Sequence, residues 1–214
     1  AFECRTVDTL LAFGNNGRVY SVPVAGLPGA RGDGQPVLTL IELEAGTQLL
    51  HYFAGPSQAQ LLLSGSGGYG FIAHVCDMIS RQRGGKAFIT CNAGEIVCAP
   101  SYIGGTSGSV PVPEATHIAC ASAGGRLLTF PIGELRTMPN GGRGLMLMSL
   151  EDKDVLIGAA AYTRSIRVQG TGRGGKPREE TLEIRSLNNA AAARGRKGKA
   201  ADWGFKPQRI GRIE

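Results

Sequence analysis

The chain has 214 residues, of which 42% are hydrophobic, so it can bury a core and is not expected to be disordered. Its sequence contains no apolar run that approaches the roughly 20 residues of a membrane-spanning helix. Glycine accounts for 33 residues, and aromatic residues make up only 6%. This composition is typical of many short strands that are joined by tight turns.

The formal net charge of +6 is distributed unevenly along the chain. Residues 1–60 carry three arginines and five acidic residues, which gives −2, and residues 61–160 carry seven of each sign, which gives 0. Residues 161–214 carry thirteen basic and five acidic residues, which gives +8. A concentrated basic segment is typical of proteins that bind a polyanion, usually nucleic acid, and the alternative is a solvated basic tail.

Three stretches of the sequence superpose without a gap, namely residues 13–40, 64–91 and 121–148. A strand-like apolar run precedes each of them and reads DTLLAF, QLLLSG or HIACAS. In this alignment a turn glycine lies 18 residues before a loop position in every copy: Gly17 before Gln35, Gly68 before Lys86, and Gly125 before Arg143.

A fourth copy matches less closely, with residues 154–169 and 190–205 separated by an apparent insertion, TGRGGKPREETLEIR. The turn glycines of the first three copies are 51 and then 57 residues apart, near the roughly 50-residue period of some propellers. We therefore predict an all-β fold, a β-propeller or β-pinwheel of about four to five four-stranded blades, in an open or a closed ring.

We expect one domain over residues 1–214, with repeats at about 8–59, 60–115, 116–153 and 154–214. The first residue is not Met and the sequence opens within the repeat pattern, so we expect a fragment of a larger subunit. Each repeat reads as a meander of strand, glycine turn, strand, glycine loop and strand. The one predicted helix spans 186–195, from a Ser186 cap to Gly195. Residues 104–115 are predicted to link two blades.

Glycine loops recur at the same place in the four copies: GARGDGQP at 29–36, RQRGGKAF at 81–88, MPNGGRGL at 138–145 and ARGRKGKA at 193–200. Glycine lets a backbone approach a ligand closely, and arginine and lysine neutralise phosphate. We therefore expect these loops to line one rim as a discontinuous cationic track. A further basic loop, GTGRGGK, adds two weaker candidates. The candidate phosphate contacts are Arg31, Arg81, Arg83, Lys86, Arg143, Arg173, Lys176, Arg194, Arg196, Lys197 and Lys199.

Motifs for chemistry are weak in this sequence. GSGGYG at 65–70 fits a dinucleotide-binding pattern, but its equivalents in the other copies are strand turns and no acidic residue follows at the required spacing. The three histidines are far apart, and the five cysteines form no CxxC pair, so we expect reduced, mostly buried thiols and no metal site. We predict Trp203 to be a core residue. We assign no catalytic residue.

The loop RQRGGKA resembles QRRGGKG, the seven-residue box of the gyrase form of a known domain, and four positions are identical: Arg83, Gly84, Gly85 and Lys86. Over essentially its whole length the chain resembles the C-terminal β-pinwheel domain of the A subunit of bacterial type IIA topoisomerases. The altered box and the phrases ARGDGQP, GYGF, LLTFPIGEL and QRIGRIE favour the topoisomerase IV branch over gyrase.

The resemblance implies a non-catalytic domain that binds and bends double-stranded DNA with little sequence preference. It would thereby influence which DNA topology is selected during supercoil relaxation and decatenation. The parent would be an ATP-dependent topoisomerase that uses ATP and Mg, with its active site outside this chain and no cofactor in this domain.

The implied partners are DNA, the N-terminal catalytic part of the same polypeptide, and an ATPase subunit in a heterotetramer. The implied location is the bacterial cytoplasm, in association with the nucleoid. Two alternatives stay open: a gyrase-type domain that wraps DNA, and a protein-interaction propeller that binds an acidic partner.

Overall fold

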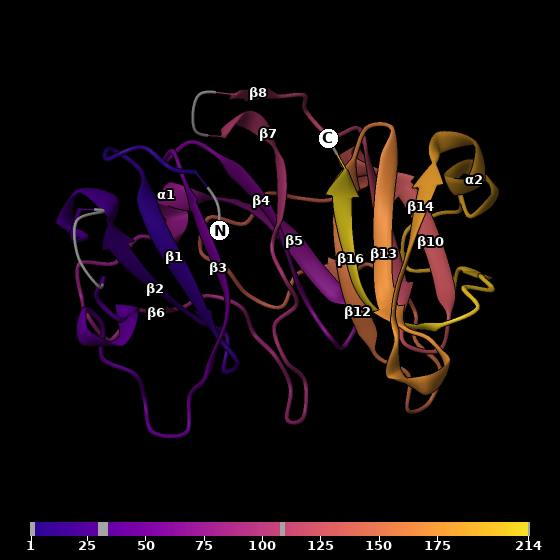
Figure 1. Cartoon of the computed structure of the whole chain (residues 1–214), viewed down its shortest axis with the longest axis horizontal. Coiled ribbons are helices and arrows are strands. Elements are labelled where there is room, and N and C mark those ends of the chain that lie inside the picture. The colour runs from indigo at the N-terminus through magenta and orange to yellow at the C-terminus, as the bar shows by residue number, and fades with distance from the viewer. Residues whose placement is uncertain (1–2, 30–33, 108–109, 214) are drawn as a thin grey trace.

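Four antiparallel sheets, each containing a hairpin with a glycine turn, make up the fold in the computed structural model (Figure 1). The structure describes residues 3–29, 34–107 and 110–213. The all-β propeller or pinwheel prediction is confirmed. Among the described residues, no strand of the first sheet pairs with a strand of the fourth, so no sheet closes the ring. No helix in the described part of the chain is long and apolar enough to cross a membrane.

The first two sheets contain the N-terminal half of the chain. In the first sheet the strand order is β3 (Leu49–Gly55), β1 (Thr9–Gly14), β2 (Arg18–Pro23) and β6 (Lys86–Ala87). In the second it is β11 (Leu145–Met146), β5 (Tyr69–His74), β4 (Gln60–Gly65), β7 (Ser101–Ser107) and β8 (Val110–Val112).

The other two sheets contain most of the C-terminal half. In the third sheet the order is β12 (Leu156–Tyr162), β9 (His117–Ser122), β10 (Arg126–Pro131) and β15 (Lys199–Ala200). In the fourth it is β14 (Pro177–Glu183), β13 (Ser165–Thr171) and β16 (Lys206–Ile213). The helices are short: α1 (Val75–Met78), α2 (Ile184–Asn189), and 3-10 turns at Val24–Gly26, Val37–Thr39, Ile132–Glu134 and Arg173–Gly175.

The outer strand of each of the first three sheets comes from the following repeat. β6 pairs with β2, β11 with β5, and β15 with β10. The predicted meander is therefore wrong for this strand. The strand that follows each of the glycine loops at 81–85, 138–144 and 193–198 leaves its own repeat and completes the sheet of the preceding one. Ser21 and Ser80 fix the first exchange, because the Ser21 hydroxyl donates to the Ser80 carbonyl at 3.0 Å and accepts from its amide at 2.9 Å.

The fourth repeat differs from its predicted outline. β12 pairs with β9, so the third sheet extends beyond the boundary expected at residue 153. The segment interpreted as an insertion contains the β13–β14 turn and all of β14, and is therefore part of the sheet. Residues 104–115 are likewise not only a linker, because β7 and β8 pair within them.

The helix predicted at 186–195 spans only Ile184–Asn189, with Glu183 instead of Ser186 at its N-terminal boundary. It ends early because the following residues bond to β10: the Thr129 amide donates to the Ala190 carbonyl, and the Ala192 amide donates to the Thr129 carbonyl. A tertiary contact therefore overrides the helix propensity of the alanine run.

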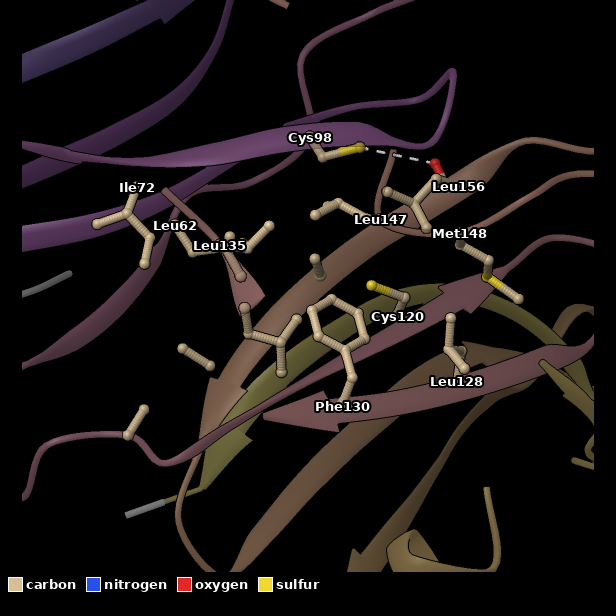
Figure 2. Packing of buried hydrophobic residues seen from close by; sticks show 14 of the residues in the cluster. Leu62, Ile72, Cys98, Cys120, Leu128, Phe130, Leu135, Leu147, Met148 and Leu156 are labelled. Atoms are coloured by element: carbon tan, nitrogen blue, oxygen red, sulfur yellow. Dashed lines mark hydrogen bonds between the residues drawn. The ribbon is translucent and has the colours of Figure 1, made fainter. Parts of the chain in front are cut away.

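Alternating side chains pack neighbouring sheets face to face. One cluster joins the first sheet to the second, another joins the second to the third, and another joins the third to the fourth. Figure 2 shows the middle cluster, which contains Leu62 and Ile72 of the second sheet and Leu128 and Phe130 of the third. The prediction that Trp203 is a core residue is confirmed, since it is buried in the cluster of the third and fourth sheets.

The cysteines are all free, but they differ in burial. Cys98 and Cys120 are buried in the middle cluster, and Cys91 is half-buried. The prediction of buried thiols is wrong for Cys4 and Cys76, which are exposed because they lie outside the face-to-face contacts of the sheets. Figure 2 shows the Cys98 thiol donating to the Leu156 carbonyl at 3.6 Å.

Candidate nucleic-acid interface

Three basic loops run along the outer edges of three successive sheets, and each ends in the strand that completes the sheet. Loop 81–85 leads into β6, loop 138–144 into β11, and loop 193–198 into β15. Since these strands are the outermost ones of their sheets, the loops lie on the rim of the fold, as expected for a surface that follows a long polymer. We refer to this edge as the outer rim.

A glycine in each loop has a packing role that the sequence did not reveal. Gly85 has φ +66°, and an added Cβ would lie 2.6 Å from the Val19 carbonyl oxygen. An added Cβ at Gly144 would likewise lie 2.2 Å from the Gly70 carbonyl oxygen, and one at Gly198 would lie 2.5 Å from the Leu127 carbonyl oxygen. These glycines approach the preceding sheet and not an external ligand. Gly84 differs, because nothing lies within 4 Å of an added Cβ there.

Strand pairing also corrects the gapless alignment of the loops. Lys86 pairs with Val19, and Lys199 pairs with the equivalent Leu127. In the second sheet the same position is occupied by Leu145, which pairs with Gly70. The third copy therefore has two more residues in its loop than the second, and Arg143 is not the equivalent of Lys86.

The cations of loop 81–85, and Lys86 just after it, differ in exposure and in the contacts they make. Arg81 is exposed. Arg83 donates to the carbonyls of Thr39 at 2.8 Å and Leu40 at 3.3 Å, yet 57% of its side chain stays exposed, so it is both oriented and accessible. Lys86 is half-buried, because its Nζ donates to the Asp77 carbonyl at 2.8 Å and lies 5.3 Å from the Phe88 ring centre.

Arg143, in the next loop, is held in place. Its guanidinium forms a 3.0 Å ion pair with Glu95 and lies 4.2 Å from the centre of the Tyr69 ring. Only 28% of its side chain is exposed, and the glutamate neutralises its charge. Because Arg143 is the only cation in loop 138–144, this loop contributes little free positive charge to the outer rim.

The loop of the fourth repeat is the most cationic. Arg196 and Lys199 are exposed, and Lys197 is 62% exposed with Glu151 at 3.8 Å. Arg194 is instead held in place, since it donates from Nη1 to the Met146 carbonyl at 2.6 Å and from its amide to Glu134 at 3.0 Å.

The remaining candidates lie elsewhere. Arg173 and Lys176 are exposed in the β13–β14 turn, at the edge of the fourth sheet and outside the exchanged loops. Arg178, which the sequence reading did not include, is exposed next to them on β14. Arg31 lies outside the described residues.

Two arginines that the sequence reading missed hold the basic loops on the rim. Arg18 donates to the carbonyls of Gly84 at 3.0 Å and Gly85 at 3.4 Å. Arg126 donates to the Gly198 carbonyl at 3.3 Å. The available signal was their position, because each directly follows the turn glycine of its copy.

An arginine–glutamate pair accompanies the loop at all three sheets. The pairs are Arg18–Glu44 at 3.0 Å, Arg143–Glu95 at 3.0 Å and Arg126–Glu151 at 2.7 Å. We refer to these as the rim pairs. In the second sheet Tyr69 stands at the strand position that Arg18 and Arg126 hold in the other two sheets. The cation that pairs with Glu95 is therefore Arg143 of the loop. The outer rim therefore presents exposed loop cations at the first and third sheets, whereas the loop of the second sheet carries only the paired Arg143, with the exposed Arg136 just before it on the edge of β5.

Comparisons with known proteins find similarity to β-propeller domains of topoisomerase A subunits, both in sequence and in fold. The family model described as DNA gyrase C-terminal domain, beta-propeller, matches residues 8–43 and 116–162. The A subunit of DNA topoisomerase 4 from Neisseria gonorrhoeae is 38% identical over 184 residues, which is 86% of this chain and 23% of that protein. Its counterpart from Escherichia coli K12 is 29% identical over 205 residues, which is 94% of this chain and 25% of that protein.

Solved structures are similar in fold. The E. coli ParC C-terminal domain matches with a TM-score of 0.79 and 24% identity, over 96% of this chain and 81% of that one. A DNA gyrase A C-terminal domain matches with a TM-score of 0.69 and 18% identity, over 95% of this chain and 64% of that one. The chain thus spans about a quarter of the two topoisomerase 4 relatives, with 23% and 25% of their lengths covered.

Proposed function

Because the chain belongs to the family of gyrase A-type C-terminal β-propeller domains, we propose that it is the duplex-DNA-binding domain of a bacterial topoisomerase IV A subunit. One observation supports this most directly, namely the exposed cations Arg81, Arg83, Arg196, Lys197 and Lys199 on loops that are fixed to the outer rim. A fixed row of cations at a sheet edge suits a repeating polyanion.

Binding by this surface is sequence-tolerant. Arginine and lysine contact phosphate oxygens, which are the same at every base pair, whereas sequence reading requires contacts to base edges. Each neutralised phosphate releases counterions, so the logarithm of the affinity falls by about 0.9 per logarithmic unit of salt for every contact.

The domain bends DNA more weakly than a closed cationic ring would. A duplex that reaches the loop cations of both the first and the third sheet must follow the curved rim past the second sheet, where the loop cation Arg143 is paired with Glu95. Bending a short duplex costs on the order of 1–6 kcal/mol, which only several phosphate contacts together offset. The bend influences which DNA crossings the catalytic part of the protein receives during relaxation and decatenation.

The wider assignment follows the same proposal. The domain itself is non-catalytic and acts beside the N-terminal part of its own polypeptide. The parent is an ATP- and Mg-dependent topoisomerase whose active site lies outside this chain and whose partner is an ATPase subunit. It acts on the nucleoid in the bacterial cytoplasm.

The test is a titration of the 214-residue chain with a fluorescent duplex of roughly 40 base pairs at several salt concentrations. We expect a steep salt dependence that is the same for unrelated sequences and is reduced by Arg81→Ala or Arg196→Ala. Arg164→Ala is the matched control, since Arg164 is also exposed but lies in the β12–β13 turn, at the end of the sheets opposite the hairpin turns. A shallow salt dependence, or an equal loss in the control, would contradict DNA binding by the rim.

A further inference from the structure

The outermost strands of the first three sheets share one exposed position on the outer rim. Strand pairing aligns Ala87 of β6, Met146 of β11 and Ala200 of β15 at this position. All three residues are exposed. The second sheet therefore presents a long apolar side chain where the first and third sheets present only a methyl group.

Met146 remains exposed although the residue before it is packed. Leu145 packs against the middle cluster, whereas 37% of Met146 is exposed. A single exposed methionine is ordinary on a protein surface, so its surroundings decide whether it has a use.

The most cationic loop of the outer rim, at residues 193–198, lies against this methionine. Arg194 donates from Nη1 to the Met146 carbonyl at 2.6 Å, and an added Cβ at Gly195 would lie 3.8 Å from Met146 Sδ. The same loop carries the exposed Arg196 and Lys197. An apolar side chain therefore stands beside accessible cations.

Tyr69, on the strand that pairs with β11, gives the methionine a fixed neighbour. It lies directly opposite Met146, and side chains at such positions have Cβ atoms about 4.5–5.5 Å apart. The Arg143 guanidinium lies 4.2 Å from the centre of the Tyr69 ring and pairs with Glu95 at 3.0 Å. Met146 therefore stands on a part of the rim that is held in place.

An apolar side chain among cations is typical of proteins that kink DNA. Such proteins insert Phe, Leu, Ile, Met or Pro between two base pairs from the minor groove, while arginine and lysine hold the duplex. A row of cations without such a side chain bends DNA only through contacts that are distributed along the phosphates. An inserted side chain instead concentrates the bend at one base step.

We propose that Met146 enters the minor groove of a duplex held by the outer rim and kinks it at the second sheet. This inference rests on the proposed function, because the cations of the rim must first bind the duplex. It also gives the second sheet a role in DNA bending, although loop 138–144 supplies little free charge.

The test measures energy transfer between dyes at the two ends of a duplex of roughly 40 base pairs, together with the salt dependence of binding. We expect binding of the 214-residue chain to raise the energy transfer. Met146→Ala should lose about half of this rise or more, with an unchanged salt dependence, because methionine carries no charge. Alanine occupies the equivalent positions 87 and 200, so the variant should fold. Met146→Leu should keep the bend.

Val155→Ala is the matched control. Val155 is also an exposed apolar residue, at 46%, but it directly precedes β12, which lies at the opposite end of the third sheet from β15. Its loss should leave the bend unchanged. A second arm uses an A·T-rich duplex whose minor groove is occupied by netropsin, which should bind the chain with a smaller rise in energy transfer.

The outcomes separate this inference from the proposed function. If the unmodified chain binds with the expected salt dependence, the inference alone is overturned by any of three results: an equal bend with Met146→Ala, an equal loss with Val155→Ala, or a full bend of the netropsin-loaded duplex. If the unmodified chain does not bind the duplex even at low salt, the proposed function fails and the inference fails with it.

Discussion

Arg18 and Arg126 occupy the same place in two different sheets, and each donates to a glycine carbonyl in a loop that belongs to the following repeat. In this way a strand residue of one repeat fixes the cation-bearing loop of the next. The glutamates of the rim pairs, Glu44 and Glu151, then reduce the charge of these arginines. The outer rim therefore combines cations that hold the loops with cations that remain accessible.

Glu151→Gln should raise the affinity for duplex DNA. Glu151 pairs with Arg126 at 2.7 Å and lies 3.8 Å from Lys197, so its neutralisation frees positive charge on the rim. One additional phosphate contact would steepen the salt dependence by about 0.9. Asp152→Asn is the matched control, because it removes the same charge from an exposed neighbour. An equal rise in both variants would show a general charge effect.

Gly85→Ala should destabilise the fold, whereas Gly84→Ala should not. The first change forces alanine into positive φ, with its Cβ 2.6 Å from the Val19 carbonyl oxygen, and the second adds a methyl group in open space. We expect a loss of about 1–3 kcal/mol in the free energy of unfolding for Gly85→Ala alone, measured by urea titration. Equal stability of the two variants would contradict the packing role of Gly85.

Arg143→Gln and Arg196→Gln should have opposite profiles. Arg143 is paired with Glu95 and stacked on Tyr69, so its loss should lower stability with little effect on the salt dependence of DNA binding. Arg196 is exposed, so its loss should reduce that salt dependence by about 0.9 and leave stability unchanged. Reversed profiles would contradict the division between held and accessible cations.

The buried thiols should make the fold less stable at alkaline pH. Burial raises the pKa of Cys98 to about 12 and raises the pKa of Cys120 as well. The unfolded chain therefore releases these protons first as the pH rises above about 9, which favours unfolding by about 1.4 kcal/mol per pH unit per thiol.

Urea titrations between about pH 8.5 and pH 10.5 measure this effect. The double variant Cys98→Ala with Cys120→Ala should show a shallower loss of stability with pH than the unmodified chain. Cys76→Ala is the control, because Cys76 is exposed. Parallel curves for the double variant and the unmodified chain would contradict the prediction.

The sequence predicted local features well and long-range pairing poorly. The runs DTLLAF, QLLLSG and HIACAS did indicate strands, and the repeated turn glycines indicated the hairpins of the first three sheets. The destination of β6, β11 and β15 could not be predicted, because a two-residue strand has no periodicity that identifies its partner. β14, which was interpreted as an insertion, was hidden for another reason: its seven residues, PREETLE, are mostly polar and exposed and show no apolar alternation.

For the candidate site, the basic loops were located correctly, but the state of each cation was not. Arg83 and Arg143 look alike in sequence, and only the structure shows that Arg83 stays 57% exposed with Glu42 at 3.8 Å, whereas Arg143 is 28% exposed and pairs with Glu95 at 3.0 Å. Arg18 and Arg126 were overlooked because each stands in a strand, away from the glycine loops. Whether these cations contact phosphate stays a prediction.

The exchange of outer strands has a consequence for synthesis on the ribosome. The first sheet receives β6 only after residue 87 has been made, 64 residues after β2 ends at Pro23. At about 5–20 residues per second, its edge is exposed for roughly 3–13 s. An unpaired edge is a template for wrong pairing, so a nascent chain of this design is most vulnerable to aggregation in the interval before each following repeat emerges.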